Sequence, residues 1–390
     1  MVSLNDKIKV MMLLPDFPEN ISQIRGGVHA AVLNLLAGFR NMPDIEIHLM
    51  TFTKNKNISN KEVLQENTFL YRLYEGPFPF HTMNHASICM IKLRKWVKQI
   101  KPDLIHYQVG NGFMLTSMFA NMNIPIIQTV HGMPSLELKQ KKQFLDKVKW
   151  LIHSKLNQRL MAKHIIHLSE FSRKKFDGFA FQSTLIIPNA IKNDYFDLSI
   201  SPEFQRKLLF IGQFDSNKNL LFLLNIFRQM LGKHKAYSLH VAGGMTDKFY
   251  YKKIQEHIYA LELHEKVIFH GWCDEQKKLD LLSRSDILVI PSKHESLPMV
   301  VMEAMASGLI VIANRTGGIP EMITDGKNGF LFDVNNPDTF HDAISKLENN
   351  LQNIYPMKIQ ARQDAYNTYH TSIIARKTKV YYHKVIQEKC

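Results

Sequence analysis

The sequence predicts an α/β protein of two domains, each built on a parallel β-sheet. Short β-branched and aliphatic runs alternate with longer segments whose apolar residues recur every three or four positions, which is the pattern of βαβ units. The alternation stops over a polar stretch near the middle of the chain and then starts again. At 390 residues the chain is also too long for one ordinary hydrophobic core.

The first half of the chain is expected to form a Rossmann-like domain over residues 1–189. The expected strands are 8–14, 45–52, 104–106, 124–130, 164–168 and 185–187, and the clearest helical segments between them are 30–39 and 88–100. Buried strands that alternate with helices favour a sheet covered on both faces.

The second half repeats this pattern and predicts another Rossmann-like domain over residues 205–370. Its expected strands are 207–211, 238–242, 266–269, 287–290 and 310–313, and its expected helices are 220–231, 250–261, 275–283, 299–307 and 338–349. Residues 190–204 are polar and contain Pro202, so we interpret them as the linker. The last segment, 371–390, is expected to be helical, and packing back on the N-terminal domain is one option for it.

Composition excludes several classes of protein. The apolar and charged fractions, 45% and 22%, are those of a folded globular chain. We find no run of about 20 apolar residues that would span a membrane, and the first apolar run has no signal-peptide pattern. The three cysteines are far apart in sequence, which favours a reducing compartment. We therefore expect a cytoplasmic location.

Positive charge is concentrated in the first half. Residues 1–190 hold 24 Lys and Arg against 13 Asp and Glu, whereas residues 191–390 hold 25 against 22. Such an asymmetry indicates an anionic partner, and no nucleic-acid-binding signature is present. Segments 139–163 and 88–101 combine basic residues with an apolar stripe at helical spacing, which is typical of helices that lie on anionic membranes. The alternative interpretation is that the stripe is core and the lysines are solvated.

The most informative motif lies at residues 294–308, where a strand runs through a turn into a helix. Ser296 is expected to cap this helix, and Pro298 suits its first turn. The amides of Leu297, Pro298 and Met299 mark the helix start, a natural anion site for a diphosphate, although proline supplies no N–H group. Glu295 and Glu303 are expected near the same mouth. Taken alone, the two glutamates would be read as solvated residues.

Four further short motifs follow expected strands. Gly317 and Gly318 form a loop after strand 310–313, and Gly212, Gln213 and Lys218 follow strand 207–211. In the first half, Gly26 and Gly27 precede a helix, and His131 follows strand 124–130. Glycine lets the backbone approach a ligand closely, although each motif also has a plain structural interpretation as a turn or a core residue.

Together these motifs closely resemble the family 4 retaining glycosyltransferases, over most of residues 207–333. The resemblance implies a GT-B fold, in which two Rossmann-like domains face each other across a cleft for donor and acceptor. It implies that Glu295 contacts the donor sugar, that Glu303 contacts the ribose and that Lys218 neutralises the diphosphate. His131 would bond to a hydroxyl of the transferred sugar. The sequence departs from the family pattern at Gln213, where the family has arginine, and at Asn219, where it has glycine.

The expected activity is transfer of a sugar from a nucleotide-diphosphate donor, with retention, to a saccharide or lipid-linked saccharide acceptor in the building of surface polysaccharides. No Asp-x-Asp pair occurs in the sequence, so we expect no metal site and no cofactor besides the sugar nucleotide. The expected location is peripheral, on the inner face of the cell membrane. Two alternatives stay open: a catalytically silent sugar-nucleotide-binding subunit, and a GT-B sugar-nucleotide epimerase.

Overall fold

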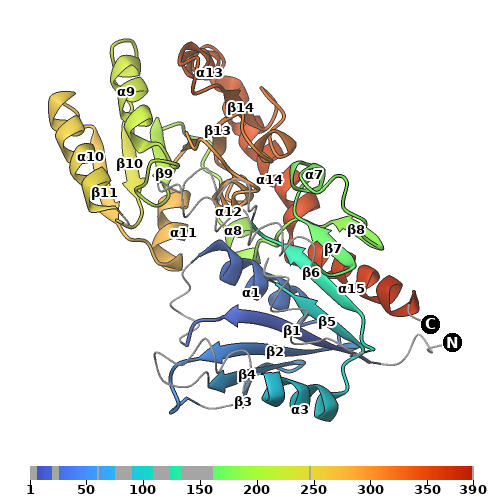
Figure 1. Cartoon of the computed structure of the whole chain (residues 1–390). Coiled ribbons are helices and arrows are strands. Elements are labelled where there is room, and N and C mark those ends of the chain that lie inside the picture. Colours follow the sequence, from blue (N-terminus) through green and yellow to red (C-terminus); the bar gives the residue numbers. More distant parts are fainter. Residues whose placement is uncertain are drawn as a thin grey trace. The chain divides into compact units, whose positions relative to one another are not determined.

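The chain folds into two compact units. Unit 1 comprises Met1–Ala190 and Thr371–Cys390, and unit 2 comprises Ile191–His370. This computed structural model (Figure 1) describes residues 7–19, 26–58, 61–74, 90–108, 123–132, 161–245 and 247–388. Each unit is an α/β sandwich around one sheet, and each is described by itself below.

Unit 1 contains an eight-stranded sheet in the order β3-β4-β2-β1-β5-β6-β7-β8. Its strands are β1 (Ile8–Asp16), β2 (Ile45–Thr53), β3 (Lys61–Gln65), β4 (Thr68–Tyr74), β5 (Leu104–Tyr107), β6 (Ile126–Val130), β7 (His164–His167) and β8 (Ser183–Ile186). Its described helices are α1 (Gly27–Phe39), α3 (Met90–Ile100), α7 (Glu170–Lys174) and α15 (Thr371–Gln387). All neighbouring strands are parallel except β3, which runs antiparallel to β4 at the edge. The sequence pattern did not predict β3 and β4.

Side chains of β1 alternate between the two faces of the sheet. Val10 and Met12 belong to the core that the sheet forms with α1 and α15. Met11 and Leu13 belong to a second core, on the side of α3. Successive residues of a strand point to opposite faces, so the uninterrupted apolar run of β1 indicates a strand covered on both sides.

The C-terminal helix α15 packs against α1 within unit 1. The closest approach is at Gly38, where a β-carbon would lie 2.5 Å from the carbonyl oxygen of Thr371 and 2.8 Å from the β-carbon of Ala375. Only glycine permits this approach. The chain therefore returns to unit 1 after completing unit 2.

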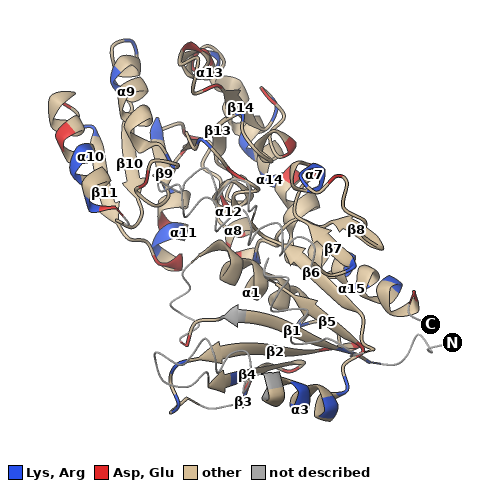
Figure 2. Ribbon diagram, in the orientation of Figure 1, with Lys and Arg blue, Asp and Glu red and all other residues tan. Residues whose placement is uncertain are grey.

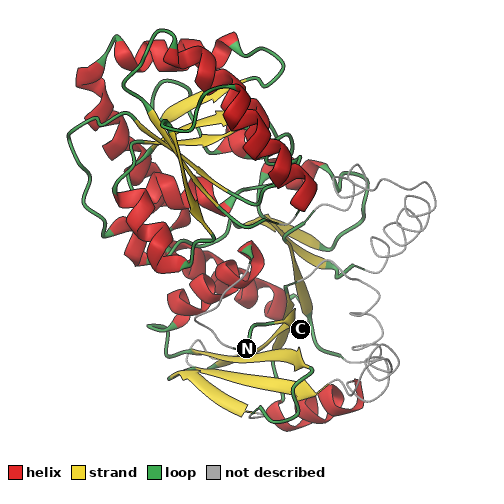
Figure 3. Ribbon diagram, turned by 90° about the vertical axis from the view of Figure 1, so that its left-hand side faces the viewer, coloured by secondary structure: helices red, strands yellow, loops and turns green. Residues whose placement is uncertain are grey.

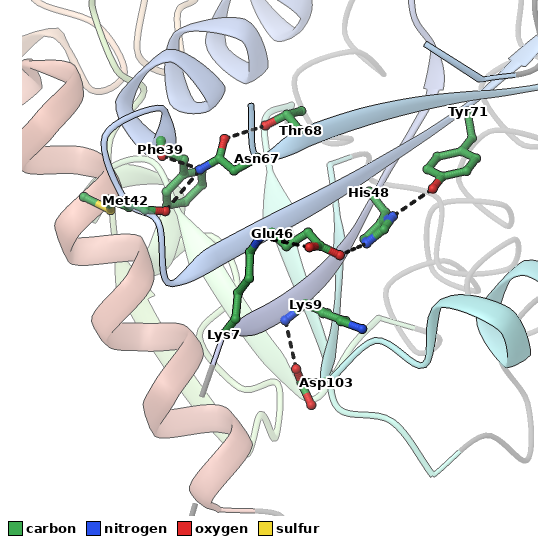
Figure 4. A network of polar contacts seen from close by, with 10 residues as sticks. All are labelled: Lys7, Lys9, Phe39, Met42, Glu46, His48, Asn67, Thr68, Tyr71 and Asp103. Carbon is green, nitrogen blue, oxygen red and sulfur yellow. Dashed lines mark hydrogen bonds and ion pairs between the residues drawn. The ribbon is translucent and has the colours of Figure 1, made fainter. Parts of the chain in front are cut away.

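Polar side chains toward the amino ends of β1 and β2 form a network of their own (Figure 4). Glu46 bonds to Lys7 at 3.0 Å and to His48 at 2.8 Å. The N–H of Lys9 donates to the carboxylate of Asp103 at 2.8 Å. These contacts lie away from the carboxyl ends of the strands, the edge at which parallel sheets bind ligands, so we assign them a structural role.

Unit 2 contains a six-stranded, fully parallel sheet in the order β11-β10-β9-β12-β13-β14. Its strands are β9 (Lys207–Ile211), β10 (Ser238–Ala242), β11 (Val267–Gly271), β12 (Ile287–Ile290), β13 (Ile310–Asn314) and β14 (Gly329–Phe332). Its helices are α8 (Asn193–Phe196), α9 (Leu220–Leu231), α10 (Lys248–Ala260), α11 (Glu275–Ser283), α12 (Met299–Ala306), α13 (Asp338–Glu348) and α14 (Ile354–Tyr369), with short 3₁₀ turns at Ile319–Glu321 and Leu351–Asn353. Figure 3 shows helices on either side of this sheet.

The segment predicted to be a linker is largely part of unit 2. From Ile191 onward it belongs to this unit, and it contains helix α8. Tyr195 is only 1% exposed, and the ring of Phe196 packs edge-on against Tyr366 at 5.5 Å between centroids. Two aromatic side chains that need burial explain why this polar stretch is folded rather than extended.

Helix α3 places its apolar side in the core. Leu93 and Val97 are buried, and the ring of Trp96 lies 5.1 Å from that of Tyr71. Most of the apolar stripe of segment 88–101 is therefore core, as its alternative interpretation held, whereas Ile91 is 69% exposed. The basic residues Arg94, Lys95 and Lys98 of α3 are exposed; Figure 2 colours the basic residues of this helix blue. Segment 139–163 lies outside the described residues, except for 161–163. In the part of the chain that the structure describes, no helix is long and apolar enough to cross a membrane.

Candidate active site

Lys218 and Glu295 form an ion pair at the carboxyl edge of the sheet in unit 2. Lys218 follows β9 and Glu295 follows β12, which are neighbouring strands. The ammonium nitrogen of Lys218 donates to Oε1 of Glu295 at 2.6 Å. The two side chains are 27% and 11% exposed, so both remain accessible to a ligand while the pair is partly shielded from water. Two residues 77 positions apart in sequence are thus brought together.

The loop that carries Lys218 is held by local polar contacts. One carboxylate oxygen of Asp215 accepts hydrogen bonds from the N–H groups of Asn217 and Lys218, at 2.8 and 2.9 Å. Asn217 in turn exchanges two 3.1 Å bonds with the backbone of His294, which links this loop to the one after β12. Asn219 adopts a left-handed conformation, with φ of 59°. Asparagine tolerates that region better than most residues, which explains how it replaces the glycine of the family pattern.

Gly317 packs directly against the backbone of Glu295. Its φ is +61°, and a β-carbon here would lie 1.6 Å from the carbonyl oxygen of Glu295. The neighbouring Gly318 donates its N–H to the carbonyl of Ser296 at 2.9 Å. The two glycines therefore fix the loop that carries Glu295, a structural role beside the ligand contact that the resemblance implies.

Helix α12 begins at Met299, and Pro298 is its cap residue without any side-chain hydrogen bond to the helix. The prediction that Ser296 caps this helix is wrong, because the turn places Ser296 two positions too early and its carbonyl bonds to Gly318. Leu297 and Pro298 are buried and Met299 is partly buried. The first-turn amides of α12 lack a side-chain cap, which leaves this helix start suited to an anionic ligand.

Glu303 lies in a second charged cluster. Its side chain, on α12, is only 5% exposed and accepts a hydrogen bond from Lys278 on α11 at 2.7 Å. Lys278 also lies 3.2 Å from Glu275, and the hydroxyl of Tyr195 donates to Glu275 at 2.5 Å. Burial opposes charge on Lys278, but the carboxylates of Glu303 and Glu275 outweigh it and raise the pKa of the lysine. Glu303 thus faces a permanent cation in the free protein.

Sequence reasoning missed Lys278, Tyr195 and Glu275. The signal for Lys278 was its place on the helix: it stands three and four residues before Leu281 and Leu282, which are both buried, so it lies on the inward side. The signal for Tyr195 was an aromatic pair inside a supposed linker. Neither signal names the partner, because Glu303 is 25 residues from Lys278 in sequence.

His131 is the predicted site residue of unit 1 with the clearest environment. It follows β6, and its Nε2 lies 2.8 Å from the amide oxygen of Gln108, which follows β5. Burial lowers the pKa of His131 to about 4, so the ring is neutral near pH 7.

Gly26, with φ of +103°, precedes α1, and Gly27 is the first residue of that helix. Both glycines are exposed.

Gln213 follows β9 and is exposed, and its side chain makes no hydrogen bond to the residues that the structure describes. It is therefore free to face a ligand but brings no charge. Among those described residues, no group of three or more His, Cys, Asp or Glu side chains is arranged to hold a metal ion. Metal-independent transfer stays a prediction.

Comparison with known proteins agrees with this architecture. The family "Glycosyl transferases group 1" matches residues 192–366, and "Glycosyltransferase Family 4" matches residues 25–195. An uncharacterised glycosyltransferase of Methanocaldococcus jannaschii is 26% identical over 330 residues, which cover 83% of this chain and 85% of the relative.

Two solved structures share the fold. Sucrose-phosphate synthase of Thermosynechococcus elongatus superposes with a TM-score of 0.81 at 16% identity, covering 98% of this chain and all of that one. HepE of Anabaena, in complex with UDP and glucose, gives 0.74 at 17% identity, covering 96% and 99%. Fold and site thus define a glycosyltransferase of the GT-B class. Within that class, the chain belongs to glycosyltransferase family 4, with the group 1 glycosyl transferase domain in its second half.

Proposed function

We propose that this protein transfers a sugar from a nucleotide-diphosphate donor to a saccharide acceptor with retention of anomeric configuration. The observation that carries the proposal is the Lys218–Glu295 pair, 2.6 Å apart and partly exposed, in loops that follow two adjacent strands. A lysine at this position supplies the positive charge that a departing diphosphate needs. A carboxylate beside it supplies an acceptor for sugar hydroxyls.

The proposed reaction breaks the bond between the anomeric carbon and the diphosphate oxygen. Lys218 and the amides at the start of α12 meet the charge that grows on the leaving diphosphate. The acceptor hydroxyl forms the new bond from the same face, and a donor phosphate oxygen takes its proton. Glu295 bonds to the transferred sugar and Glu303 to the ribose. This scheme uses no enzymic nucleophile and no metal ion.

The ion pair gives Glu295 a second role in this proposal. In the free protein its carboxylate is the partner of Lys218, so a bound diphosphate competes with it for the ammonium group. Glu295 therefore keeps the lysine side chain ordered before the donor binds, and it turns to the sugar when the phosphate arrives. Ordering a charged group in advance lowers the entropy cost of binding.

We further propose that the acceptor is carried on an anionic membrane. Arg94, Lys95 and Lys98 on α3 and the following Lys101 are exposed. Each basic residue near an anionic surface contributes about 1 kcal/mol. Because most of the apolar side of α3 is core and Ile91 is the exposed exception, this attachment rests mainly on charge. It should therefore weaken strongly between low and high salt.

The experiment that tests the activity is a thermal-shift and turnover screen without added metal, against UDP-, GDP-, ADP- and dTDP-sugars. UDP-glucose comes first, because HepE of similar fold was solved with UDP and glucose. We expect one donor to raise the melting temperature and to release its nucleotide slowly, with and without EDTA. The Glu295→Gln variant should abolish that release.

Each failure of this screen has a distinct meaning. Binding of a donor without transfer or hydrolysis would indicate the silent-subunit alternative. Interconversion of donors without an acceptor would indicate an epimerase.

For the membrane proposal, sedimentation with vesicles of anionic and of neutral lipid is compared at two salt concentrations. Equal binding to both kinds of vesicle would contradict it.

A further inference from the structure

The tautomer of His131 follows from its hydrogen bond to Gln108, its partner among the described residues. Its Nε2 faces the amide oxygen of Gln108 at 2.8 Å, and a carbonyl oxygen accepts but never donates. Nε2 therefore carries the proton. Because burial lowers the pKa of His131 to about 4, the neutral ring holds only this one proton near pH 7. Nδ1 is then a bare acceptor, and it is buried without a hydrogen-bond partner among the described residues.

The orientation of the Gln108 amide is set by what lies on its other side. Its Nε2 lies 3.8 Å from the sulfur of Met12, and 3.2 and 3.3 Å from the two ring nitrogens of His106. A thioether sulfur accepts hydrogen bonds and has none to donate. The NH₂ group therefore belongs on this side, which turns the amide oxygen toward His131.

His106 is held in turn by two hydroxyl groups. Tyr382 on α15 lies 2.6 Å from its Nδ1, and Thr129 on β6 lies 2.7 Å from its Nε2. His106, Tyr382 and Gln108 are each at most 2% exposed. Two hydroxyls can supply one donor and one acceptor to a neutral imidazole, so the ring keeps one orientation. Gln108 is thus held by contacts that run through His106 on β5 to Tyr382 on α15, the last helix of the chain.

Among the residues that the structure describes, the lining of the cavity beside this network carries no formal charge. This small cavity has room for about two water molecules. It is lined by Ala31, Leu35, His106, Gln108, Thr129, His131, Ile166, Leu168, Ile187, Pro188, Asn189, Ala190, Ile374 and Thr378. None of these is Asp, Glu, Lys or Arg, and His106 and His131 are the titratable groups among them. No neighbouring carboxylate in this lining pulls a second proton onto His131.

We propose that Gln108 is a positioning residue that holds His131 as the Nε2–H tautomer, so that Nδ1 accepts a hydrogen bond from a neutral hydroxyl group of the donor sugar. The proposal rests on the proposed function only for the identity of that ligand. A bare nitrogen lone pair attracts a hydroxyl proton and repels an anion, so Nδ1 of His131 selects a sugar hydroxyl and not a phosphate or carboxylate.

The test of the tautomer does not depend on activity. The full-length protein is labelled with nitrogen-15 in histidine, and the His131 signals are assigned with the His131→Asn variant. We expect a protonated Nε2 and a bare Nδ1 at pH 7. The Gln108→Met variant, similar in size but with only the weak acceptor of a thioether, should show a mixture of the two tautomers, whereas Gln276→Met on the exposed face of α11 should change nothing.

A second variant keeps the hydrogen bond and changes the charge. Gln108→Glu still accepts from Nε2, but its carboxylate favours the imidazolium form, which has no acceptor nitrogen. Transfer by this variant should fall as the pH drops from 7 to 5, whereas the natural protein stays nearly flat over that range. Gln108→Met should lower kcat/KM about tenfold, the size of one lost hydrogen bond, without this pH dependence.

The outcomes separate the two proposals. A bare Nε2 in the natural protein, or an unchanged tautomer in Gln108→Met, would overturn the positioning role even if transfer is demonstrated. The expected tautomers in natural and variant protein support that role even if no tested sugar nucleotide is a substrate, in which case the proposed function alone fails.

Discussion

The predicted site residues that follow the strands of the two sheets differ in their electrostatics. In unit 2, Lys218 faces Glu295 at 2.6 Å and Lys278 faces Glu303 at 2.7 Å, so the edge consists of paired charges. In unit 1, burial keeps His131 neutral, and the ring bonds to the uncharged amide of Gln108 beside a cavity whose described lining has no formal charge. The charged pairs of unit 2 suit a diphosphate, and the uncharged surroundings of His131 suit hydroxyl groups. The same parallel-sheet architecture thus supports two kinds of recognition, because side chains after the strands and not the sheet decide the chemistry.

The largest effect should come from removing the charge of Lys218. The Lys218→Met variant leaves the departing diphosphate without its side-chain cation, so kcat/KM for the donor should fall about 100- to 1000-fold. Steady-state kinetics with the donor found in the screen measures this. Lys233→Met, an exposed lysine elsewhere in unit 2, is the matched control and should change it little. A loss below threefold would remove Lys218 from the mechanism.

The second effect concerns stability at the other charged pair. Lys278→Met leaves the carboxylate of Glu303, only 5% exposed, without its cation. We expect a loss of about 2–3 kcal/mol, somewhat below the value for a fully buried pair because Lys278 keeps some contact with water. Urea unfolding measures it. The double variant Lys278→Met/Glu303→Met should recover most of the loss, and Lys277→Met on the exposed side of α11 should cost little. An equal loss in single and double variants would contradict an electrostatic cause.

The third effect is a difference between the two units in their stability at acid pH. Burial lowers the pKa of His106 to about 3 and the pKa values of His131 and His167 to about 4, from the ordinary 6.5. Below pH 6.5 the unfolded chain binds more protons than the folded one. The stability that these groups give is therefore complete above pH 6.5, and it falls by up to about 1.4 kcal/mol per pH unit for each histidine as the pH drops toward 4.

Unit 2 should resist acid longer. The cations beside Glu275 and Glu348 lower the pKa of both carboxyls by more than burial raises it. The stability that these carboxylates contribute is therefore lost only as the pH falls below about 4.5. Hydrogen exchange followed by mass spectrometry at pH 7, 6 and 5 should show β5–β7 losing protection before β9 and β12. The His167→Phe variant should reduce the difference, since neither ring nitrogen has a partner among the described residues. Parallel loss in both units would refute the comparison.

The smallest effect should come from restoring the arginine of the family pattern. Gln213 is exposed beside the loop that carries Lys218, so Gln213→Arg adds a second cation at the diphosphate end. We expect about a fivefold rise in donor affinity, because a charged hydrogen bond at an exposed position is worth roughly 1 kcal/mol. Calorimetric titration with the free nucleoside diphosphate measures it, with Gln276→Arg as control. If the affinity for the nucleoside diphosphate does not change, Gln213 does not lie beside the phosphates.

Much of the fold was predictable because hydrophobic periodicity records burial directly. The strands β9, β10 and β12 and the helices α9 and α11 have the predicted bounds, since each is a run with an unambiguous period. The edge strand β3 and its neighbour β4 were not predictable in this way: β3 is partly exposed and contains charged residues, so its apolar pattern is weak. The helical tail was predicted, but its place beside α1 depends on the contact at Gly38, 333 residues from Thr371.

The sequence by itself determined the two parallel-sheet domains, the family and the residue types at the strand ends, because these depend on local patterns along the chain. Only the tertiary structure decided which charges meet. The pairs of Lys218 with Glu295 and of Lys278 with Glu303, and the bond between Gln108 and His131, join segments 77, 25 and 23 residues apart in sequence. Periodicity reports which way a side chain faces, whereas its partner is set by how neighbouring strands and helices pack, and that packing decides the charge and the tautomer of each group.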